Sequence, residues 1–515
     1  MRAANPVLIV SMALCAAIGI WGVFAPVQMS SAALAFTGYA LDSLDWLFMA
    51  VCTLFLALSV FLAFGPYGHV KLGADDEEPE FDTVSWLSML FAGGMGGGIL
   101  FWGVAEPIYH FTSPPGQEGL TPEAARTAFA ITNLHWGLHA WSIYAVCALV
   151  IGYFSFRRNA PTMVSTPIAY SLGPLLGPRV TRGVSSVADI IGVLAVVFGM
   201  AGSLAMGALM TRSGMNEVFG TPNNNMMSII ILVVMTVAFI ISACTGVDKG
   251  IKILSNTNMV MAIAVMLFVI IVGPTTFILD VFITSIGDYL SSIVQLSFRI
   301  FSFDGELRDW THGWTLTYLI WWIAWGPFVG IFIARISRGR TIREFCLGVI
   351  LVPTIFSMLW FAVFGGTGVY IEMFGAGGLS ELVFEDVSRA LYGFFGYLPW
   401  TLVLNTIIVL LVFIFLVTGA DSGTFVIAMM TSDGDLNPST RQKVMWGLIM
   451  AAITAGTLLS GSVEIAKAMA ITGAIPYTFI VLLQLVGFLR ALREERPGAP
   501  REAVTAAAPA RSTAE

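Results

Sequence analysis

The sequence predicts an all-α polytopic membrane protein with about twelve transmembrane helices. Hydrophobic residues make up 57% of the 515 residues and charged residues only 11%, whereas a soluble domain has about 25% charged residues. Most of the outer surface is therefore expected to face the lipid bilayer. The net charge of −7 is carried by loops between apolar runs, so we expect no nucleic-acid partner.

Twelve apolar runs are long enough to cross a hydrocarbon core of about 30 Å. They lie at about residues 7–27, 45–66, 84–108, 126–155, 184–211, 227–244, 254–273, 314–336, 346–368, 398–429, 441–461 and 470–489. The first run is long for the apolar core of a signal peptide and is expected to be retained. The amphipathic segment 275–300 is expected to lie along the membrane surface. Segments 109–125 and 372–396 are expected to be ordered loops.

The basic residues predict the orientation. With the N-terminus inside, 19 of the 25 Lys and Arg residues fall on one side of the membrane. The six exceptions are Arg126, Arg212, Arg299, Arg308, Arg389 and Lys467. Because cytoplasmic loops carry the excess of basic residues, both termini are expected in the cytoplasm, with the protein in a bacterial inner membrane. The five cysteines lie in apolar runs without CxxC spacing, which indicates small buried side chains.

Two spans contain residues that break helices. Five of the seven residues from Ala92 to Gly98 are glycines, each costing a helix about 0.8–1 kcal/mol relative to alanine, so an unwound backbone is favoured over close helix packing. In the eighth span Pro327 ends the segment WWIAWGP and predicts a second break. The breaks fall in the first helix of two five-span sets, spans three to seven and eight to twelve. Such a pair predicts a transporter site near the membrane midplane.

Aromatic residues gather at the same depth as these breaks. The fourth and eighth spans contain Trp136, Trp141, Tyr144, Trp321, Trp322 and Trp325. Tryptophan usually belongs to interfacial belts, but the two in the fourth span lie well inside it. Aromatic faces around a cavity attract a quaternary ammonium or sulfonium cation, with about 2 kcal/mol or more per desolvated contact. The pattern favours a cation-binding cavity.

Ionisable residues within the spans are functional candidates by default. For Asp189 and Asp421 a structural hydrogen bond is an equally good interpretation. His135 and His139 have the spacing of a metal-binding pair, but no third ligand is evident and metal binding is disfavoured. Glu106 precedes a proline at the outer end of the third span, where a gating role and a packing role both stay open.

The motifs at these breaks are specific. The third span contains GMGGGILFWGVAEPIYHF at 94–111, the fourth HWGLHAWSIYA at 135–145, and the eighth WTLTYLIWWIAWGPFVGIFIARISRGRTIREF at 314–345. Together with SNTNMV at 255–260 and TGADSGTF at 418–425, they resemble the betaine/choline/carnitine transporter family over nearly the whole chain.

The resemblance implies a LeuT-like fold of two inverted five-helix repeats preceded by two extra helices, usually assembled as a homotrimer. The segments would be 1–83 with the first two spans, 84–273 as the first repeat and 274–310 as an amphipathic connecting helix. The second repeat would be 311–490, and 491–515 a disordered cytoplasmic tail. The implied function is secondary active import of a small trimethylammonium or dimethylsulfonium osmolyte, not enzymatic catalysis.

The resemblance also implies a substrate site. The cation box would comprise Trp136, Trp141, Tyr144 and Trp322, with Trp321 and Trp325 alongside. The glycine-rich backbone, with Met95, Gly96 and Gly98, would face the carboxylate of the substrate. Proton-driven choline carriers of the family can have an aspartate at the position of Gly98. Its absence here favours a zwitterion similar to glycine betaine.

The coupling ion is expected to be Na⁺, and no other cofactor is expected. Sodium-coupled members hold one ion between the third and tenth helices, where Ala92, Met95, Phe415 and Thr418 match, although Gly419 replaces a neighbouring hydroxyl. A second family site needs two threonines, and Val196 and Met200 stand at those positions. Sodium-independent exchangers place an arginine near the ion position, and 253–271 contains none. We expect one sodium ion per cycle.

Other interpretations stay open. A proton-coupled choline or trimethylamine carrier or a substrate/product exchanger is the main alternative, and carnitine and dimethylsulfoniopropionate are further candidate solutes. A channel would need a continuous polar pore lining, and a membrane enzyme would need a nucleophile–base pair or a metal cluster. An osmosensing member would carry long charged terminal extensions.

Overall fold

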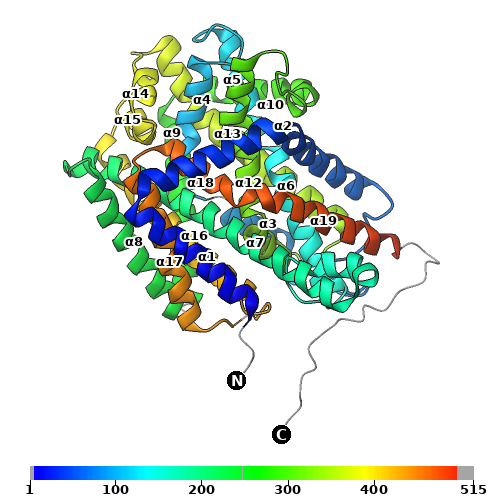
Figure 1. Ribbon diagram of the computed structural model, residues 1–515. Coiled ribbons are helices and arrows are strands. Elements are labelled where there is room, and N and C mark those ends of the chain that lie inside the picture. The colour runs from blue at the N-terminus through cyan, green and yellow to red at the C-terminus, as the bar shows by residue number, and fades with distance from the viewer. Residues whose placement is uncertain (1–4, 95, 246–247, 436, 496–515) are drawn as a thin grey trace.

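The computed structural model describes residues 5–94, 96–245, 248–435 and 437–495. Within these ranges the protein is a bundle of α-helices, and the pairing of Lys71 with Thr341 is its only β-bridge. Figure 1 shows long helices packed side by side, with α1 and α2 on the outside of the bundle. The all-α, polytopic fold class is confirmed.

The helices of the described chain correspond to the twelve expected spans. They are α1 (Pro6–Phe24), α2 (Pro26–Phe64), the pair α3 (Thr83–Gly94) and α4 (Gly98–Thr112), the pair α5 (Pro122–Trp136) and α6 (Leu138–Gly152), α7 (Thr166–Phe219), α8 (Asn225–Thr245), α9 (Asp248–Val272), α12 (Thr317–Ile336), α13 (Ile342–Phe374), α16 (Thr401–Met430), α17 (Thr440–Leu459), and the pair α18 (Val463–Thr472) and α19 (Ala474–Arg493).

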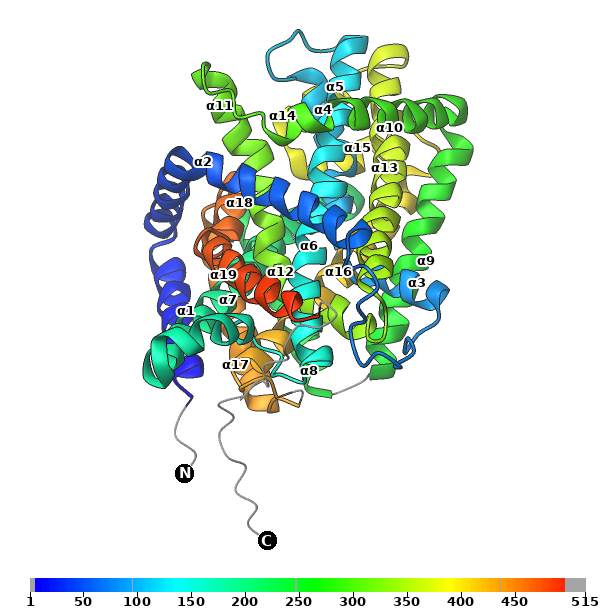
Figure 2. The ribbon, with the colours of Figure 1, turned by 90° about the vertical axis from the view of Figure 1, so that its right-hand side faces the viewer.

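Helix α10 (Thr275–Ser297) follows the predicted amphipathic segment. By length and composition it is one of eleven helices of the described chain that could cross a membrane. Figure 2 shows it lying across the end of α9 and α13, not parallel to them. It packs against α5 and α13. This position agrees with a helix along the membrane surface, and the pair α3–α4 together with α9 completes the twelve spans.

Two expectations about local structure were wrong. The eighth span is not broken at Pro327, because α12 is one continuous helix from Thr317 to Ile336. A proline removes a single amide hydrogen bond, and close packing of Gly326 and Gly330 against Cys147 holds this segment against α6. The expected loop 372–396 is largely helical, with α14 (Leu379–Glu385), a 3₁₀ turn at Val387–Arg389 and α15 (Ala390–Phe395). Likewise, the first part of 109–125 belongs to α4.

The two ends of the described chain lie on one face of the bundle, here called the termini face. The Asn5 side chain donates to the carbonyl of Thr431, at the end of α16. Near the other end of the chain, Arg157 and Arg158 pair with Glu495 and Glu494. This shared face agrees with an even number of spans. The disordered tail was expected from residue 491, but α19 continues to Arg493 and Ala491 and Leu492 are buried in it, so that boundary was too early. Residues 496–515 of the expected tail lie outside the described residues.

Helices from the two five-span sets interleave at the centre. α6 packs against α12, α7 against α16, and α4 against α13. Glycines permit these close approaches; a Cβ on Gly207 would lie 2.3 Å from Leu416. The centre of the bundle, where a binding site is expected, is therefore built from both sets.

Candidate functional site

A cavity of about 560 Å³ lies at the centre of the bundle. Its walls come from α3, α4, α5, α6, α7, α9, α12 and α16 and from the gap between α3 and α4. Most of the lining is aromatic or aliphatic, and the polar groups are few. The aromatic members are Phe101, Trp102, Trp136, Tyr144, Tyr318, Trp321, Trp322, Trp325, Phe328, Phe332 and Phe415. A mostly apolar cavity of this size suits a small organic solute.

The predicted break in the third span is present. α3 ends at Gly94 and α4 begins at Gly98, and Gly96 and Gly98 line the cavity. The first-turn amides of a helix lack intrahelical carbonyl partners and carry a partial positive charge. The start of α4 therefore presents an anion-attracting end to the cavity. Met95 lies outside the described residues, and for Ala92 only its place in α3 is described.

Four predicted aromatic residues form one cluster. The Trp322 ring centroid lies 4.9 Å from that of Tyr144, 5.5 Å from that of Trp136 and 6.1 Å from that of Trp141. Trp136, Tyr144 and Trp322 line the cavity, whereas Trp141 is fully buried behind them. The structure thus brings the predicted box together with one correction: Trp141 supports the rings and does not face the cavity.

The other predicted tryptophans and several unpredicted rings extend this wall. Trp321 and Trp325 line the cavity along α12. Tyr318, one turn before Trp322, also lines it and lies 5.8 Å from Trp136 between ring centroids. The ring centroids of Trp102 and Tyr318 lie 5.6 Å apart. The helical spacing of Tyr318 from Trp322 was a signal in the sequence, because residues four apart share a face.

A second break, missed in the sequence, separates α5 from α6. Gly137 has φ −102° and ψ −132°, and the helix resumes at Leu138. A Cβ on Gly137 would lie 2.4 Å from the carbonyl oxygen of Asn133. The last carbonyls of a helix have no partners within it, and that of His135 accepts a hydrogen bond from Trp322 Nε1 at 2.9 Å. The break therefore supplies an anchor for a ring of the cavity wall.

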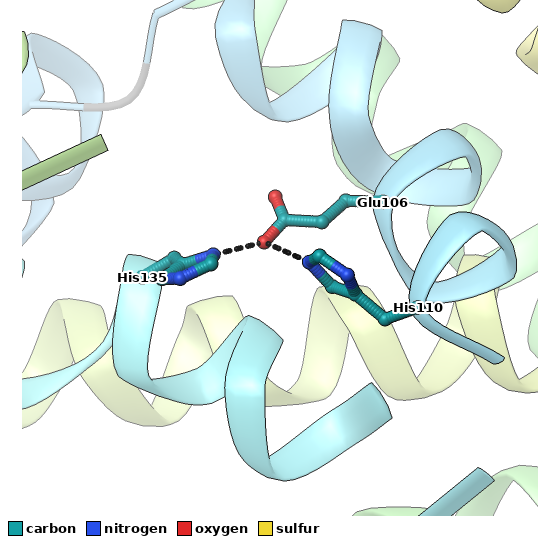
Figure 3. A group of neighbouring side chains, drawn as sticks. All are labelled: Glu106, His110 and His135. Atoms are coloured by element: carbon teal, nitrogen blue, oxygen red, sulfur yellow. Dashed lines mark hydrogen bonds and ion pairs between the residues drawn. The ribbon is translucent and has the colours of Figure 1, made fainter. Parts of the chain in front are cut away.

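Glu106 contacts Trp136 of the same wall, and Figure 3 shows its carboxylate directed at His110 and His135. Its Oε1 is 2.6 Å from His135 Nδ1, and its Oε2 accepts a hydrogen bond from Trp136 Nε1 at 2.7 Å. His110 Nε2 lies 3.5 Å from Oε1. On its other side, His135 Nε2 contacts Thr315 Oγ1 at 3.0 Å. All three residues drawn in Figure 3 are completely buried.

This group also has a composition found in metal sites. One ligand atom from each of Glu106, His110 and His135 lies within 4.8 Å of the others. Two ligands at about 2.1 Å from a tetrahedral zinc ion would lie about 3.4 Å apart, whereas the His135–Glu106 contact is 2.6 Å. Since both carboxylate oxygens already have hydrogen-bond partners, the geometry is that of a hydrogen-bonded network.

Two of the four residues expected to hold sodium are placed by the structure. Phe415 and Thr418 line the cavity on α16, and a Cβ on Gly97 would lie 3.8 Å from Phe415 Cβ. The Thr418 hydroxyl donates to the carbonyl of Ile414 at 2.9 Å, or of Phe415 at 3.2 Å, which leaves its oxygen lone pairs available. The space beside Gly419 is open, with no atom within 4 Å of a Cβ built there.

No hydroxyl takes the place of the second family sodium site. Val196 and Met200 are buried on α7, and the Met200 Cε atom would lie 2.7 Å from a Cβ on Gly423. An apolar side chain therefore fills the space between α7 and α16 at this level.

The other ionisable candidates have structural partners. Asp189 accepts hydrogen bonds from the amide and the hydroxyl of Ser165, and Asp421 accepts one from Ser242 at 2.8 Å. His139 Nε2 contacts Ser297 Oγ at 3.0 Å. His135 and His139 lie on opposite sides of the Gly137 break and have different partners, so they do not form a pair.

Further rings pack against the cavity wall near Tyr318. Trp314 stacks on Tyr318 at 6.0 Å between centroids. The buried Lys467 ammonium lies 4.7 Å from the Trp314 centroid and 6.0 Å from that of Trp102. On the other side the lining continues along α12 to Phe332, towards the termini face.

Comparison with known proteins assigns the chain that forms this cavity to a family. The family model described as BCCT, betaine/carnitine/choline family transporter, matches residues 6–497. The chain belongs to this family. Its members are transporters and not enzymes, so this BCCT chain is a multi-pass membrane transporter of the betaine/choline class.

Curated relatives cover nearly the whole of this BCCT chain. It is 43% identical to the glycine betaine transporter OpuD of Bacillus subtilis, over 94% of each chain. The ectoine/hydroxyectoine transporter of Virgibacillus pantothenticus is 37% identical, over 95% of this chain and 96% of its own. The osmo-independent choline transporter BetT1 of Acinetobacter baylyi is 36% identical, over 87% of this chain and 86% of its own.

Proposed function

We propose that this BCCT protein imports a zwitterionic trimethylammonium or dimethylsulfonium osmolyte similar to glycine betaine, coupled to one sodium ion. The observation that carries the proposal is the pairing of two opposite recognition elements in one cavity. Trp136, Tyr144 and Trp322 offer ring faces to a cation, and the start of α4 at Gly98 offers backbone amides to a carboxylate. A zwitterion satisfies both at once.

Two further observations favour the zwitterion over a bare cation. The described residues lining the cavity include no Asp, Glu, Lys or Arg, so a quaternary ammonium would meet no carboxylate there. The relative OpuD is named a glycine betaine transporter and matches the chain over 94% of its length. The names of BetT1 and of the ectoine transporter show that related chains take other solutes, which makes choline and ectoine the competing substrates.

The sodium proposal rests on α16 and the break between α3 and α4. Thr418, the carbonyl of Phe415 and the backbone carbonyls at Ala92 and Met95 would hold the ion, with water completing the shell of hard oxygens. When bound, Na⁺ would supply positive charge that holds the unwound segment against α16. With Gly419 in place of a second hydroxyl, sodium affinity is expected to be weak. The alternatives are a proton-coupled choline or trimethylamine carrier and an exchanger.

We infer the conformational state of the transporter, inward-facing or outward-facing, from the position of the cavity. The lining reaches Phe332 towards the termini face, whereas Trp314 and Tyr318 stack above it on the opposite side. If the termini are cytoplasmic, as the basic residues predict, this is the conformation that releases substrate into the cell.

The test is uptake into proteoliposomes with imposed gradients. Labelled glycine betaine, choline, carnitine, dimethylsulfoniopropionate and ectoine would each be supplied with an inward Na⁺ gradient, an inward proton gradient, or excess internal substrate. We expect glycine betaine uptake driven by Na⁺, with a coupling ratio near one. Choline uptake driven by protons without Na⁺ would overturn both parts of the proposal, and uptake only by counterflow would establish the exchanger.

A further inference from the structure

We propose that the buried Glu106 carboxylate is a specificity-determining residue that strengthens cation binding by acting through Trp136. The inference rests on the proposed cation site and adds a residue that lies outside the cavity lining. Glu106 is on α4 and fully buried, and its Oε2 accepts the indole N–H of Trp136 at 2.7 Å. Trp136 itself lines the cavity, so a carboxylate lies one hydrogen bond behind the ring that faces the substrate.

The hydrogen bonds around Glu106 favour an ionised carboxylate. Oε2 accepts from Trp136, whose indole nitrogen can only donate. Oε1 is bonded to His135 Nδ1 at 2.6 Å, and the neutral tautomer that donates from Nδ1 leaves Nε2 to accept from the Thr315 hydroxyl at 3.0 Å. Every hydrogen-bonding side-chain atom in the series Trp136–Glu106–His135–Thr315 then has a partner. No proton is required on the carboxylate, because hydrogen bonds to the charged form stabilise that form.

A carboxylate in this position acts on a bound cation in two ways. Its hydrogen bond to the indole N–H is charge-assisted and shifts electron density towards the ring, which makes the negative face of the ring more attractive to a cation. Its charge also attracts the cation through a desolvated interior, where screening is weaker than in water. Neither effect acts on an uncharged ligand of the same shape.

The same group fixes the geometry of the cavity wall. His135, held by Glu106, offers its backbone carbonyl to Trp322 Nε1 at 2.9 Å. The indole N–H groups of Trp136 and Trp322 are therefore anchored on Glu106 and on the backbone of its partner His135, respectively. A loss of Glu106 that only loosened the wall would weaken the binding of all ligands alike. The charge effect predicts a loss confined to cations.

Among the described residues, the ionisable neighbours of the group include His110 and Lys467. His110 Nε2 is 3.5 Å from Glu106 Oε1, and Lys467 lies over Trp102 and Trp314. The substrate cation, when present across Trp136, would be a further counter-charge for Glu106. Burying a carboxylate without full compensation is costly, and the bound cation recovers part of that cost.

The experiment compares cationic and zwitterionic ligands with a neutral one that has the shape of choline. Binding of choline, glycine betaine and 3,3-dimethylbutan-1-ol, the neutral carbon analogue of choline, would be measured in detergent by displacement of labelled substrate and by isothermal titration calorimetry. In Glu106→Gln, which retains an amide oxygen to accept the indole N–H, we expect about tenfold weaker binding of choline and glycine betaine. The affinity for the neutral analogue should be unchanged.

Two further variants make the result decisive. Trp136→Phe removes the N–H bridge and should reduce the preference for charged ligands. Adding Glu106→Gln to Trp136→Phe should lower the affinity for cations less than Glu106→Gln does in the wild-type protein, because the two residues act through one hydrogen bond. Asp189→Asn is the matched control: it removes a buried carboxylate that is bonded to Ser165 and distant from the box, and should leave the preference unchanged.

Equal losses for charged and neutral ligands in Glu106→Gln would show that Glu106 only supports packing, and would overturn the proposal. Unchanged binding of all three ligands would overturn it as well. If Glu106→Gln fails to fold, the preference for choline over its neutral analogue in Trp136→Phe decides: an undiminished preference contradicts the proposal. Failure of the wild-type protein to bind any trimethylammonium solute would instead refute the proposed function.

Discussion

Trp322 packs against the three other predicted box residues, Trp136, Trp141 and Tyr144. Trp322→Ala should abolish uptake and weaken substrate binding about 30-fold, because one desolvated cation–π contact of about 2 kcal/mol is lost. Binding to purified protein and uptake into proteoliposomes would measure both effects. Trp322→Phe keeps a ring face, so its affinity and uptake should lie between those of the wild type and of Trp322→Ala. Near-normal affinity in Trp322→Ala would remove this residue from the box.

Gly98 is the place where a single charge should change the preferred substrate. A Cβ there would lie 3.3 Å from Trp136 Cη2, so Gly98→Asp sets an anion beside the box after a small shift of that ring. Attraction to a bare cation and repulsion of a carboxylate should then move the choline-to-betaine preference about tenfold towards choline. Gly98→Ala controls for the added volume. If both variants still prefer betaine, the amides at the start of α4 are not the carboxylate site.

Thr418 tests the sodium proposal. Thr418→Ala removes the hydroxyl from the cavity side of α16 and should raise the Na⁺ concentration for half-maximal uptake by about tenfold, the scale of one interaction with a charged group. Thr424→Ala is the matched control, since its hydroxyl also bonds within α16, to Ala420, but is fully buried and outside the cavity lining. An unchanged sodium requirement in Thr418→Ala would contradict the site.

Among the helices, the break at Gly137 positions residues from both of its sides. A Cβ 2.4 Å from the Asn133 carbonyl cannot be accommodated without moving the backbone. Gly137→Ala should therefore destabilise the protein by about 1–3 kcal/mol and weaken substrate binding, because Trp136 and Trp141 flank the break. Thermal unfolding in detergent and substrate titration would measure this.

Gly183→Ala in α7 is the control for this prediction. No atom lies within 4 Å of a Cβ at that position, and alanine is favoured over glycine in a helix by about 1 kcal/mol. The protein should be unchanged or slightly more stable. Gly137→Ala behaving in the same way would mean that the break does not depend on glycine.

The helix breaks show how far sequence patterns predict elements. The five glycines from Ala92 to Gly98 predicted the gap between α3 and α4, because so many glycines in about two turns leave the helix without side-chain support. Pro327 predicted a break that is absent, because packing of α12 on α6 outweighs one missing hydrogen bond. The single Gly137 gave no comparable signal, since an isolated glycine is tolerated within helices.

For the molecule as a whole, an ionic network on the termini face joins distant parts of the chain. Arg157 pairs with Asp75 and Glu495, and Arg158 with Glu494. Burial alone would raise the pKa of the Glu495 carboxyl, but hydrogen bonds from Arg157 and Tyr153 outweigh it and lower the pKa below its usual 4.5. A carboxyl whose pKa is lower in the folded state than in the unfolded state stabilises the folded protein at pH values above the unfolded-state pKa. This contribution is lost as the pH falls through the folded-state pKa.

Glu495→Gln should accordingly lower the stability of the protein at pH 7 by about 1 kcal/mol, since the pair is partly solvated. The difference from wild type should shrink as the pH falls below about 4.5, where the wild-type carboxyl also becomes neutral. Melting temperatures in detergent between pH 3.5 and 7 would measure it. A difference independent of pH would show that the Glu495 charge makes no contribution.

The sequence by itself determined the membrane class, the twelve spans and the family, because hydrocarbon imposes span length and composition whatever the packing; the surface position of α10 stays a prediction. Its motifs also predicted the rings of the cavity, although the inverted repeat, the homotrimer and Na⁺ coupling stay predictions. Only the tertiary structure decided that Trp141 lies behind the cavity wall and that Glu106, His135 and Trp136 form one network. Their contacts join separate helices, α4 and α5, and depend on the local path of the chain at Gly137, which hydrophobic patterns do not encode.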